Sequence, residues 1–527
     1  MRYTRKRSLR QLEVEIKHDV SGASNRFLRH YKICHGAQNT SSCLSFLQSE
    51  LQTPHSSASD TDTVISAAIR VTINEAKAAM DMITKFTTLS ISYREQLAIE
   101  DCKELLDFSV SELAWSLGEL NLIRAGANNH HFDGNIKAWL SAALSNQDTC
   151  LEGFEGTDRR LEEFIKGSLK QVSMLIGNVL GLYTQLHALP PPHNSTVGSL
   201  PLWMTAGDQE LVSGGGSLRI LPDAVVSLDG TGQHRSISDA INDAPNYSSR
   251  RYVIHVKQGQ YHENVDMKRR KTNIMLVGDG IGKTIITGSR NFMQGWTTFR
   301  TATVAVSGKG FIARDITFRN LAGPENHQAV ALRVDSDQSA FYRCSIEGHQ
   351  DTLYAHSLRQ FYRECEIYGT IDYIFGNGAA VFQNCKIYTR LPLPLQKVTI
   401  TAQGRKNPHQ STGFSIQDSY ILANQPTYLG RPWKEYSRTV FINTYMSSMV
   451  QPRGWLEWFG NFGLGTLWYG EYRNYGPGAS LSGRVKWPGY HVINDPATAS
   501  FFTVRQFLDG AAWLPSTGVK FTAGLNV

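Results

Sequence analysis

A short repeat in the second half of the chain constrains the fold more than any other feature of the sequence. Its three copies begin at Cys344, Cys365 and Cys385, and each has an isoleucine two residues later. The copies start 21 and 20 residues apart. A repeat of this length, built from short strands with no helix between them, predicts the coils of a right-handed parallel β-helix. Leucine-rich repeats are similarly long, but their Leu/Asn pattern is missing, and a sandwich or barrel predicts no such repeat.

The region before the β-branched runs has a different sequence pattern. Apolar residues such as Ile65, Ile69 and Ile73 recur at three- and four-residue spacing, which predicts amphipathic helices joined into an up-and-down bundle. Three prolines and three glycines mark a linker before the first β-branched runs. We therefore expect four segments: a basic tail at 1–24, an all-α four-helix bundle at 25–187, a linker at 188–217 and an all-β domain, the right-handed parallel β-helix, at 218–527.

Because coils stack, the repeat length predicts which side chains that are far apart in the sequence lie next to each other. Asp351 and Asp372 are 21 residues apart, so they should lie one above the other on neighbouring coils, at a strand spacing of roughly 4.8 Å. Gln328 and Gln350 are 22 residues apart, and Gln350 directly precedes Asp351. Three successive coils should thus bring two glutamines and two aspartates into one patch.

Two neighbouring carboxylates do not both ionise readily, so one should stay charged while the other keeps its proton to higher pH. The pair can thereby supply a nucleophile and a general acid from one residue type. Arg431 lies 59 residues beyond Asp372, close to three coils on, and is the candidate for deciding which aspartate stays ionised. A single aspartate in a β-helix turn more often caps the turn, so the interpretation depends on the whole set.

Five segments together resemble the signature segments of plant pectin methylesterases, in the order and with the spacing typical of that family. The similarity extends from about residue 218 to the C-terminus. The segments are Gly259–Val265, Gln328–Leu332, Gln350–Tyr354, Asp372–Gly376 and Leu429–Trp433.

The resemblance implies a role for each member of the patch. Asp372 would be the nucleophile that attacks the methyl-ester carbonyl of a galacturonate unit, and Arg431 would keep it ionised and aimed. Gln350, with Gln328, would stabilise the oxyanion of the transition state. Asp351 would act as proton donor to the leaving methoxide and then as base toward water. The implied activity is hydrolysis of the methyl esters of homogalacturonan (pectin) in plant cell wall modification, with no cofactor.

The resemblance also implies substrate-binding residues. Trp433 would stack on a sugar ring, and Thr298 would lie in the substrate groove. Two positions depart from the usual family pattern: Tyr373, where Phe is more common, and His349, where Tyr is more common.

The helical region resembles the invertase/pectin methylesterase inhibitor domain. That resemblance implies the disulfides Cys34–Cys43 and Cys102–Cys150 in the helical region. In the β-helix the repeat would equally permit Cys344–Cys365 or Cys365–Cys385, and the family pattern favours Cys365–Cys385 with Cys344 as a buried free thiol. The domain could contact the catalytic cleft as an intramolecular inhibitor, assist folding, or be a retained passenger, and separate inhibitor proteins are further candidate partners.

The sequence gives no indication of a metal site, a nucleic-acid partner or a membrane span. No Cys-x-x-Cys pair or zinc-protease histidine pattern occurs, so no metal is expected. A net charge of +7 fits a polyanionic substrate, and the basic run near the N-terminus fits a solvated tail better than a nucleic-acid arm. No run of 18 apolar residues is present, so we expect no membrane span.

The family resemblance places the protein in the secretory route to the cell wall. Three Asn-x-Ser/Thr sequons, at Asn39, Asn194 and Asn246, and the disulfides fit an oxidising, glycosylating environment. The first residues lack a signal peptide, so we expect the natural start to lie upstream of Met1. A glycosidase or lyase on the same polymer, or action mainly as an inhibitor of other methylesterases, are the alternative functions.

Overall fold

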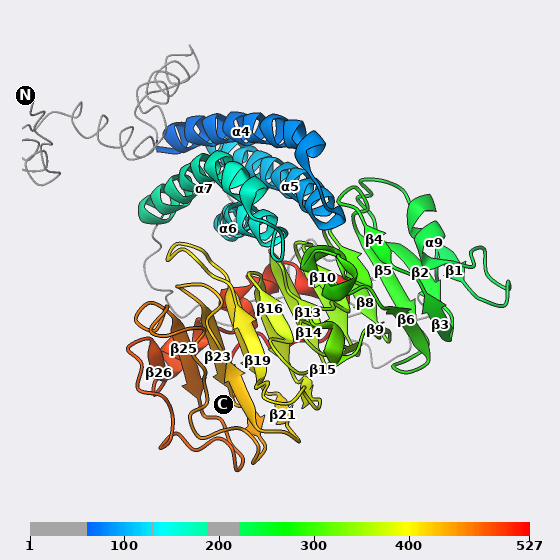
Figure 1. Cartoon of the computed structure of the whole chain (residues 1–527), viewed down its shortest axis with the longest axis vertical. Helices are drawn as coiled ribbons and strands as arrows, with labels where there is room; N and C mark the ends of the chain where they lie inside the picture. The colour runs from blue at the N-terminus through cyan, green and yellow to red at the C-terminus, as the bar shows by residue number, and fades with distance from the viewer. Residues whose placement is uncertain (1–60, 128–130, 188–220, 527) are drawn as a thin grey trace, which may run out of the picture.

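The computed structural model describes residues 61–127, 131–187 and 221–526. They form two parts that lie against each other, a group of long helices and a stack of short parallel strands (Figure 1). The predicted fold class, a helical bundle followed by a right-handed parallel β-helix, is confirmed.

Four long helices make up the part of the helical domain that the structure describes. The capping box of α5 shows how local sequence sets a boundary: the Ser92 side chain accepts from the Glu95 backbone N–H, and the Glu95 carboxylate accepts from the Ser92 N–H. Among the described residues, no helix combines the length and the apolar character needed to cross a membrane. The helical elements are α4 (Thr61–Lys85), the 3₁₀ turn η1 (Phe86–Leu89), α5 (Tyr93–Arg124), α6 (Phe132–Glu152) and α7 (Arg160–Leu186).

The predicted helical periodicity puts its apolar residues inside. Ile65, Ile69 and Ile165 are fully buried in one cluster shared by the four helices. A disulfide joins Cys102 on α5 to Cys150 on α6, which confirms that predicted pair. The predicted Cys34–Cys43 pair lies outside the described residues.

The β-helix consists of three parallel sheets. Each coil in the middle of the stack contributes one strand to each sheet, whereas the coils at the ends contribute fewer. The first sheet has eleven strands: β1 (Ala224–Val226), β2 (Tyr252–Val256), β5 (Ile274–Gly278), β8 (Ile312–Arg314), β11 (Ser339–Tyr342), β14 (Arg359–Arg363), β17 (Ala379–Gln383), β20 (Gly413–Gln417), β23 (Arg438–Ile442), β25 (Trp468–Tyr472) and β26 (Tyr490–Val492). The second has eight: β3 (Gly259–His262), β6 (Thr284–Gly288), β9 (Thr317–Asn320), β12 (Ser345–Glu347), β15 (Glu366–Gly369), β18 (Lys386–Thr389), β21 (Tyr420–Leu422) and β24 (Tyr445–Met446). The third has seven: β4 (Val265–Met267), β7 (Val304–Val306), β10 (Leu332–Val334), β13 (Leu353–Tyr354), β16 (Ile374–Gly376), β19 (Val398–Gln403) and β22 (Thr427–Gly430).

The strand register confirms the repeat as the unit of one coil. Ser345 of β12 pairs with Glu366 of β15, which pairs with Lys386 of β18. The three cysteines that precede these strands therefore stack in the buried core, as the spacing predicts.

The predicted Cys365–Cys385 disulfide is wrong for this structure, in which both residues are free buried thiols, as is Cys344. Side chains on neighbouring coils point in the same direction at about the strand spacing of 4.8 Å, whereas a disulfide draws its two Cβ atoms to about 3.8 Å. Each thiol instead faces a backbone carbonyl, with Cys365 Sγ 3.4 Å from the Phe341 oxygen and Cys385 Sγ 3.5 Å from the Tyr362 oxygen.

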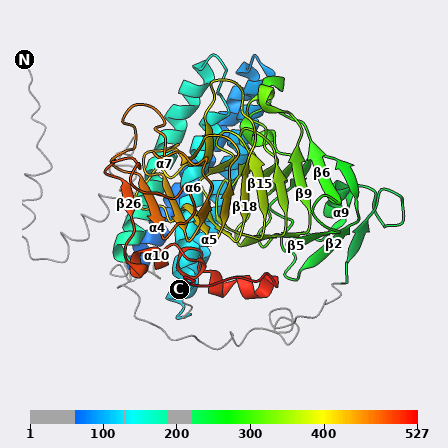
Figure 2. The ribbon, with the colours of Figure 1, turned by 90° about the horizontal axis from the view of Figure 1, so that it is seen from below.

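Short helices pack at the N-terminal end of the stack and along one of its faces. Helix α9 (Ile237–Asp243) packs its buried Ile237, Ala240 and Ile241 into the core at the N-terminal end of the stack. The C-terminal segment returns along the outer face of the eleven-stranded sheet (Figure 2), where Val504, Leu508 and Trp513 form a second apolar cluster with that sheet. Its elements are α10 (Pro496–Ser500), α11 (Val504–Phe507), η5 (Gly510–Ala512) and η6 (Leu514–Thr517).

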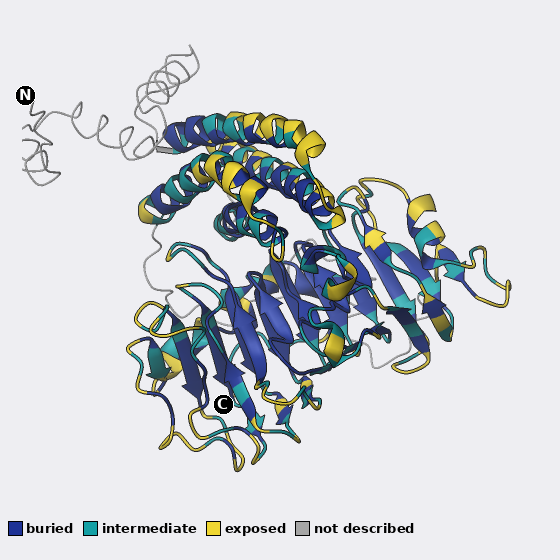
Figure 3. Cartoon of the chain, viewed as in Figure 1, coloured by how far each residue is buried: buried dark blue, intermediate teal, exposed yellow. Residues whose placement is uncertain are grey.

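The helical domain covers the outer face of the seven-stranded sheet. Its apolar cluster continues into Ala305, Tyr354, Phe375 and Ala402, which point outward from β7, β13, β16 and β19. Exposed residues gather on the helix faces that point away from the strands (Figure 3). The face of the β-helix beneath the helices is therefore buried within this chain.

Candidate active site

The two predicted aspartates lie at equivalent turns of neighbouring coils. Asp351 precedes β13 and Asp372 precedes β16, and Leu353 pairs with Ile374 two residues later in each case. Both aspartates have left-handed backbone conformations, with φ of 61° and 50°. Such strain in non-glycine residues is tolerated where the surrounding structure enforces it, here at the turn that leads into the seven-stranded sheet.

Arg431 holds the carboxylate of Asp372 through two nitrogens. Its Nε lies 2.9 Å from Oδ1 and its Nη2 lies 2.6 Å from Oδ2. Thr399, at the start of the neighbouring strand β19, donates its hydroxyl to Oδ1 at 2.6 Å and accepts the Asp372 backbone N–H at 3.0 Å. A carboxylate with a bidentate guanidinium and a hydroxyl donor is stabilised in its ionised form.

The position of Arg431 corrects one detail of the prediction. It follows β22, and the register runs from Ile374 through Thr401 to Gly430, so Arg431 lies two coils beyond Asp372 rather than close to three. The coils between them are longer than the repeat because loops extend them on both sides of β19.

Asp351 lies in surroundings that disfavour its charged form. Burial, and then the neighbouring Asp372 carboxylate, raise the pKa of Asp351 well above its ordinary value. The Arg431 guanidinium opposes this shift but does not outweigh it. The neighbouring Asp372 carboxylate thus acts on the pKa of Asp351 in the direction that the sequence predicts from their stacking.

A cavity of about 260 Å³ opens onto this pair. Gln328, Gln350 and Thr298, all predicted from the sequence, line it together with both aspartates. Each of these three residues is partly exposed, which leaves room for contact with a substrate.

Aromatic residues form the apolar side of the cavity. Trp433, a predicted residue, packs edge-on against Phe375, which stacks on Tyr354 at 4.1 Å. Gly404 is required beside it, because a Cβ there would lie 2.9 Å from Trp433 Cε3. Trp458 was missed by the sequence interpretation; its ring lies 4.2 Å from the Arg431 guanidinium carbon. The only sequence signal for it is an aromatic residue in a segment without strand periodicity.

The helical domain supplies part of the same cavity wall, which the sequence did not predict residue by residue. Thr149, Glu152 and Glu155 line the cavity from α6 and the turn that follows it. Thr149 Oγ1 lies 2.9 Å from His356 Nε2, and the Glu152 carboxylate lies 2.7 Å from Lys434 Nζ. A polymer that entered the cavity would meet these groups.

Two family models match the chain. Residues 223–511 match the pectinesterase model, and residues 30–182 match the model of the plant invertase/pectin methylesterase inhibitor. The first match covers more than half of the chain.

Individual relatives agree with these matches. A pectinesterase/pectinesterase inhibitor from Arabidopsis thaliana is 67% identical over 473 residues, which cover 88% of this chain and 87% of that protein. Another from Prunus persica is 50% identical over 477 residues, covering 88% and 90%. The solved pectin methylesterase from carrot superposes with a TM-score of 0.58 at 52% identity, covering 59% of this chain and 100% of that chain.

Proposed function

The chain belongs to the pectinesterase family, with a domain of the plant invertase/pectin methylesterase inhibitor family before the catalytic one, and from this premise we propose that it hydrolyses the methyl esters of pectin. The products are de-esterified pectin and methanol. The observation that carries the proposal is the unequal carboxyl pair: Asp372 is clamped by Arg431, and beside it the pKa of Asp351 is raised by burial.

The nucleophile is Asp372. Its ionised carboxylate attacks the ester carbonyl carbon of a galacturonate unit and forms a tetrahedral intermediate. The bidentate contact of Arg431 and the hydroxyl of Thr399 support this role, because both favour the charged form and fix its direction. The amide groups of Gln350 and Gln328 line the same cavity and stabilise the oxyanion.

Asp351 completes the proton transfers. Its proton passes to the methoxide as the C–O bond breaks, which leaves an acyl-enzyme on Asp372 and releases methanol. Asp351 then takes a proton from water as the hydroxide adds to the acyl carbon, and the bond to Asp372 breaks. The raised pKa of Asp351 supports its starting as the acid. Trp433 and Thr298 position the sugar ring in the cavity.

The test is replacement of the nucleophile with a matched control. Asp372→Ala should abolish methanol release from esterified pectin. Asp315→Ala is the control, because Asp315 also has a positive φ and a two-nitrogen contact with an arginine, Arg343, but on the exposed surface. Wild-type enzyme should release methanol without new reducing or unsaturated chain ends. Methanol release by Asp372→Ala near the wild-type rate would remove the proposed nucleophile.

We further propose that the helical domain restrains this activity from within the chain. Support comes from the groups that it places at the cavity, and from the ion pairs of Glu152 with Lys434 and of Asp148 with Lys406. Glu152→Lys should raise methanol release by the full chain, because like charges would then meet at Lys434. Glu163→Lys on exposed α7 is the control. Equal rates for the two variants would contradict the restraint.

Two broader proposals follow from the family. Separate inhibitor proteins of the helical family bind the same groove, and the protein acts in the cell wall after secretion. The Cys102–Cys150 disulfide and the exposed sequon residue Asn246 support an oxidising, glycosylating route. Detection of N-glycan on Asn246 in protein isolated from plant cell walls would test this route, and recovery of unglycosylated protein only from inside cells would contradict it.

A further inference from the structure

One short turn carries two of the groups that the proposed reaction needs. It connects β12 to β13 and holds Gln350 directly beside Asp351 in the chain, so a shift of this turn moves both groups. Backbone hydrogen bonds tie the turn to the next coil: Gly348 donates its N–H to Tyr368 at 3.3 Å, and Asp351 donates its N–H to Ile371 at 3.0 Å. The position of this turn therefore decides whether the proposed oxyanion donor and the proposed acid are in place.

An arginine from two coils farther on reaches the beginning of the same turn. Arg390 directly follows β18, and β12 pairs with β15, which pairs with β18. The Nη1 of Arg390 donates to the Gly348 carbonyl at 3.0 Å, while its backbone N–H donates to the Gly369 carbonyl at 2.8 Å on the coil between. The side chain thus spans the intervening coil and joins the turn to a coil that is not its neighbour.

Two further groups fix the direction of the Arg390 side chain. Its guanidinium carbon lies 5.3 Å from the centre of the Tyr368 ring, and its Nη2 lies 3.4 Å from the Glu347 carboxylate. Tyr368 in turn stacks on Tyr388 at 4.6 Å, which holds the ring in place. Burial lowers the pKa of Arg390, and the Glu347 carboxylate opposes this shift, so the ion pair offsets part of the cost of burying the charge. A guanidinium held by a ring, a carboxylate and a carbonyl is well placed to fix the turn.

From these contacts we propose that Arg390 is a positioning residue for the reaction. It fixes the turn so that the Gln350 amide meets the oxyanion and Asp351 meets the leaving group. Arg390 is not among the residues that line the catalytic cavity, so it acts through the Gly348 carbonyl. The inference rests on the proposed function and adds to it a residue that the substrate does not touch.

A second arginine provides the matched comparison. Arg319 of β9, one coil before β12, binds the same Glu347 carboxylate at 2.8 Å. The side chains of Arg319 and Arg390 are almost equally exposed, at 27% and 30%, so their charges are similarly screened. Among the described side chains, Arg390 alone binds the Gly348 carbonyl. Arg319→Gln therefore removes a charge next to Glu347 without removing a contact of the turn.

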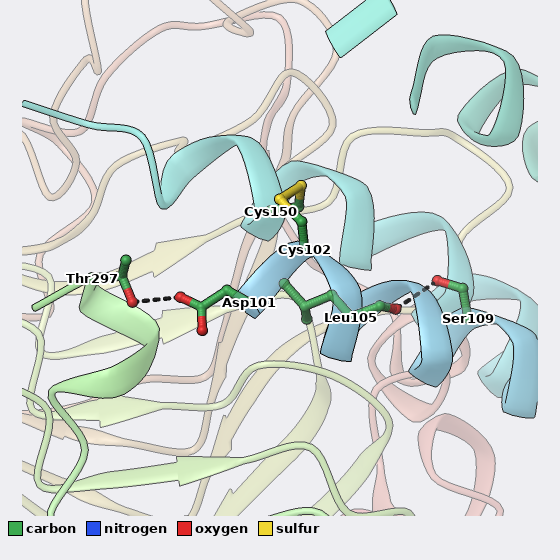
Figure 4. The surroundings of a disulfide bond; sticks show 6 residues. All are labelled: Asp101, Cys102, Leu105, Ser109, Cys150 and Thr297. Carbon is green, nitrogen blue, oxygen red and sulfur yellow. Dashed lines mark hydrogen bonds between the residues drawn. A yellow bond between two sulfur atoms is a disulfide. The ribbon is translucent and has the colours of Figure 1, made fainter. Parts of the chain in front are cut away.

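The experiment compares Arg390→Gln with Arg319→Gln in two measurements. Methanol release at varied pectin concentration is measured on the lone catalytic domain, residues 221–527. That domain is suitable because its main core draws only on its own residues and because the disulfide that the structure describes, Cys102–Cys150, lies within the helical domain (Figure 4). Amide hydrogen exchange of the segment Gly348–Asp351 is measured by mass spectrometry on the full chain, and exchange in β23 is the reference for general destabilisation.

We expect Arg390→Gln to lower kcat at least about tenfold and to change KM by less than about twofold, because the oxyanion and the departing methoxide are absent from the bound substrate. Exchange of the turn amides should become about tenfold faster, the scale of one charge-assisted hydrogen bond, while exchange in β23 stays unchanged. Arg319→Gln should change kcat and turn exchange by less than about twofold.

Four results would each overturn the positioning role: kcat of Arg390→Gln within about twofold of wild type, an equal loss of kcat in Arg319→Gln, turn exchange that is unchanged or rises only together with exchange in β23, or a loss of kcat with a matching rise in KM. The last of these would place Arg390 in substrate binding instead. Absence of methanol release by the wild-type lone domain would contradict the proposed function, while hydrogen exchange would still decide whether Arg390 holds the turn.

Discussion

The hydroxyl of Thr399 offers a sharp test of how the nucleophile is positioned. It donates to Asp372 Oδ1 at 2.6 Å and accepts the Asp372 backbone N–H at 3.0 Å, and it is buried. Thr399→Val keeps the shape of the side chain but removes both interactions. Thr399→Ser keeps the hydroxyl and removes only a methyl group.

The expected loss can be worked from these two contacts. A hydrogen bond to a charged group contributes about 1.5–3 kcal/mol. Since 1.36 kcal/mol corresponds to a factor of ten in rate, Thr399→Val should lower kcat roughly 10- to 150-fold. KM should change little, because Thr399 is not among the residues that line the catalytic cavity. The unpaired Asp372 N–H should also lower the free energy of unfolding by about 1–3 kcal/mol.

The assay is methanol release at varied pectin concentration, together with thermal unfolding, on the lone catalytic domain so that the helical domain does not interfere. Thr444→Val is the control, because its buried hydroxyl donates at 3.0 Å to the Ile442 carbonyl, and Thr444 is not among the cavity-lining residues. It should lose stability and keep kcat. If Thr399→Val kept kcat within about twofold, or if Thr399→Ser lost as much as Thr399→Val, the positioning role would be refuted.

Three further predictions follow from buried polar groups. Asp351→Asn should lower kcat about 100-fold, the usual scale of a lost general acid, in single-turnover and steady-state methanol assays. Because burial and then Asp372 raise the pKa of Asp351, the free energy of unfolding of the wild type should fall as pH rises through that raised pKa, and Asp351→Asn should lose this fall in chemical denaturation across pH. The buried Tyr373 hydroxyl has no hydrogen-bond partner among the described residues, so Tyr373→Phe should stabilise the protein by about 1 kcal/mol. Tyr362→Phe is the control and should destabilise the protein by about 1 kcal/mol, because it removes the hydrogen bond to Gln360. Changes of the same sign in the free energy of unfolding of the two variants would contradict this account.

The sequence predicted those parts of the molecule that repeat. One coil length placed Asp351 above Asp372 because parallel pairing preserves register from coil to coil. The same regularity placed Ile65 and Ile69 inside the helical bundle. In both cases a regular spacing along the sequence determines which side chains are buried and which lie next to each other.

Features that depend on irregular segments or on contact between domains could not be predicted in this way. The number of coils between Asp372 and Arg431 was overestimated because loop residues lengthen the sequence between strands without adding a coil. Trp458 lies outside the strands, and Glu152 reaches the cavity only through docking of the helical domain. The error for Cys365 and Cys385 arose because stacking brings side chains close without turning them toward each other.

The long coils on either side of β19 have a consequence for how this scaffold can vary. Pairing of Ile374 with Thr401 and of Thr401 with Gly430 fixes the heights of Asp372 and Arg431, whatever the number of residues that bulge out between strands. The exposed Leu391 and Leu395 belong to one such bulge. Insertions or deletions there can remodel the walls that a polysaccharide meets and leave the reacting groups in place, so that evolution or protein engineering can retune substrate preference without rebuilding the catalyst.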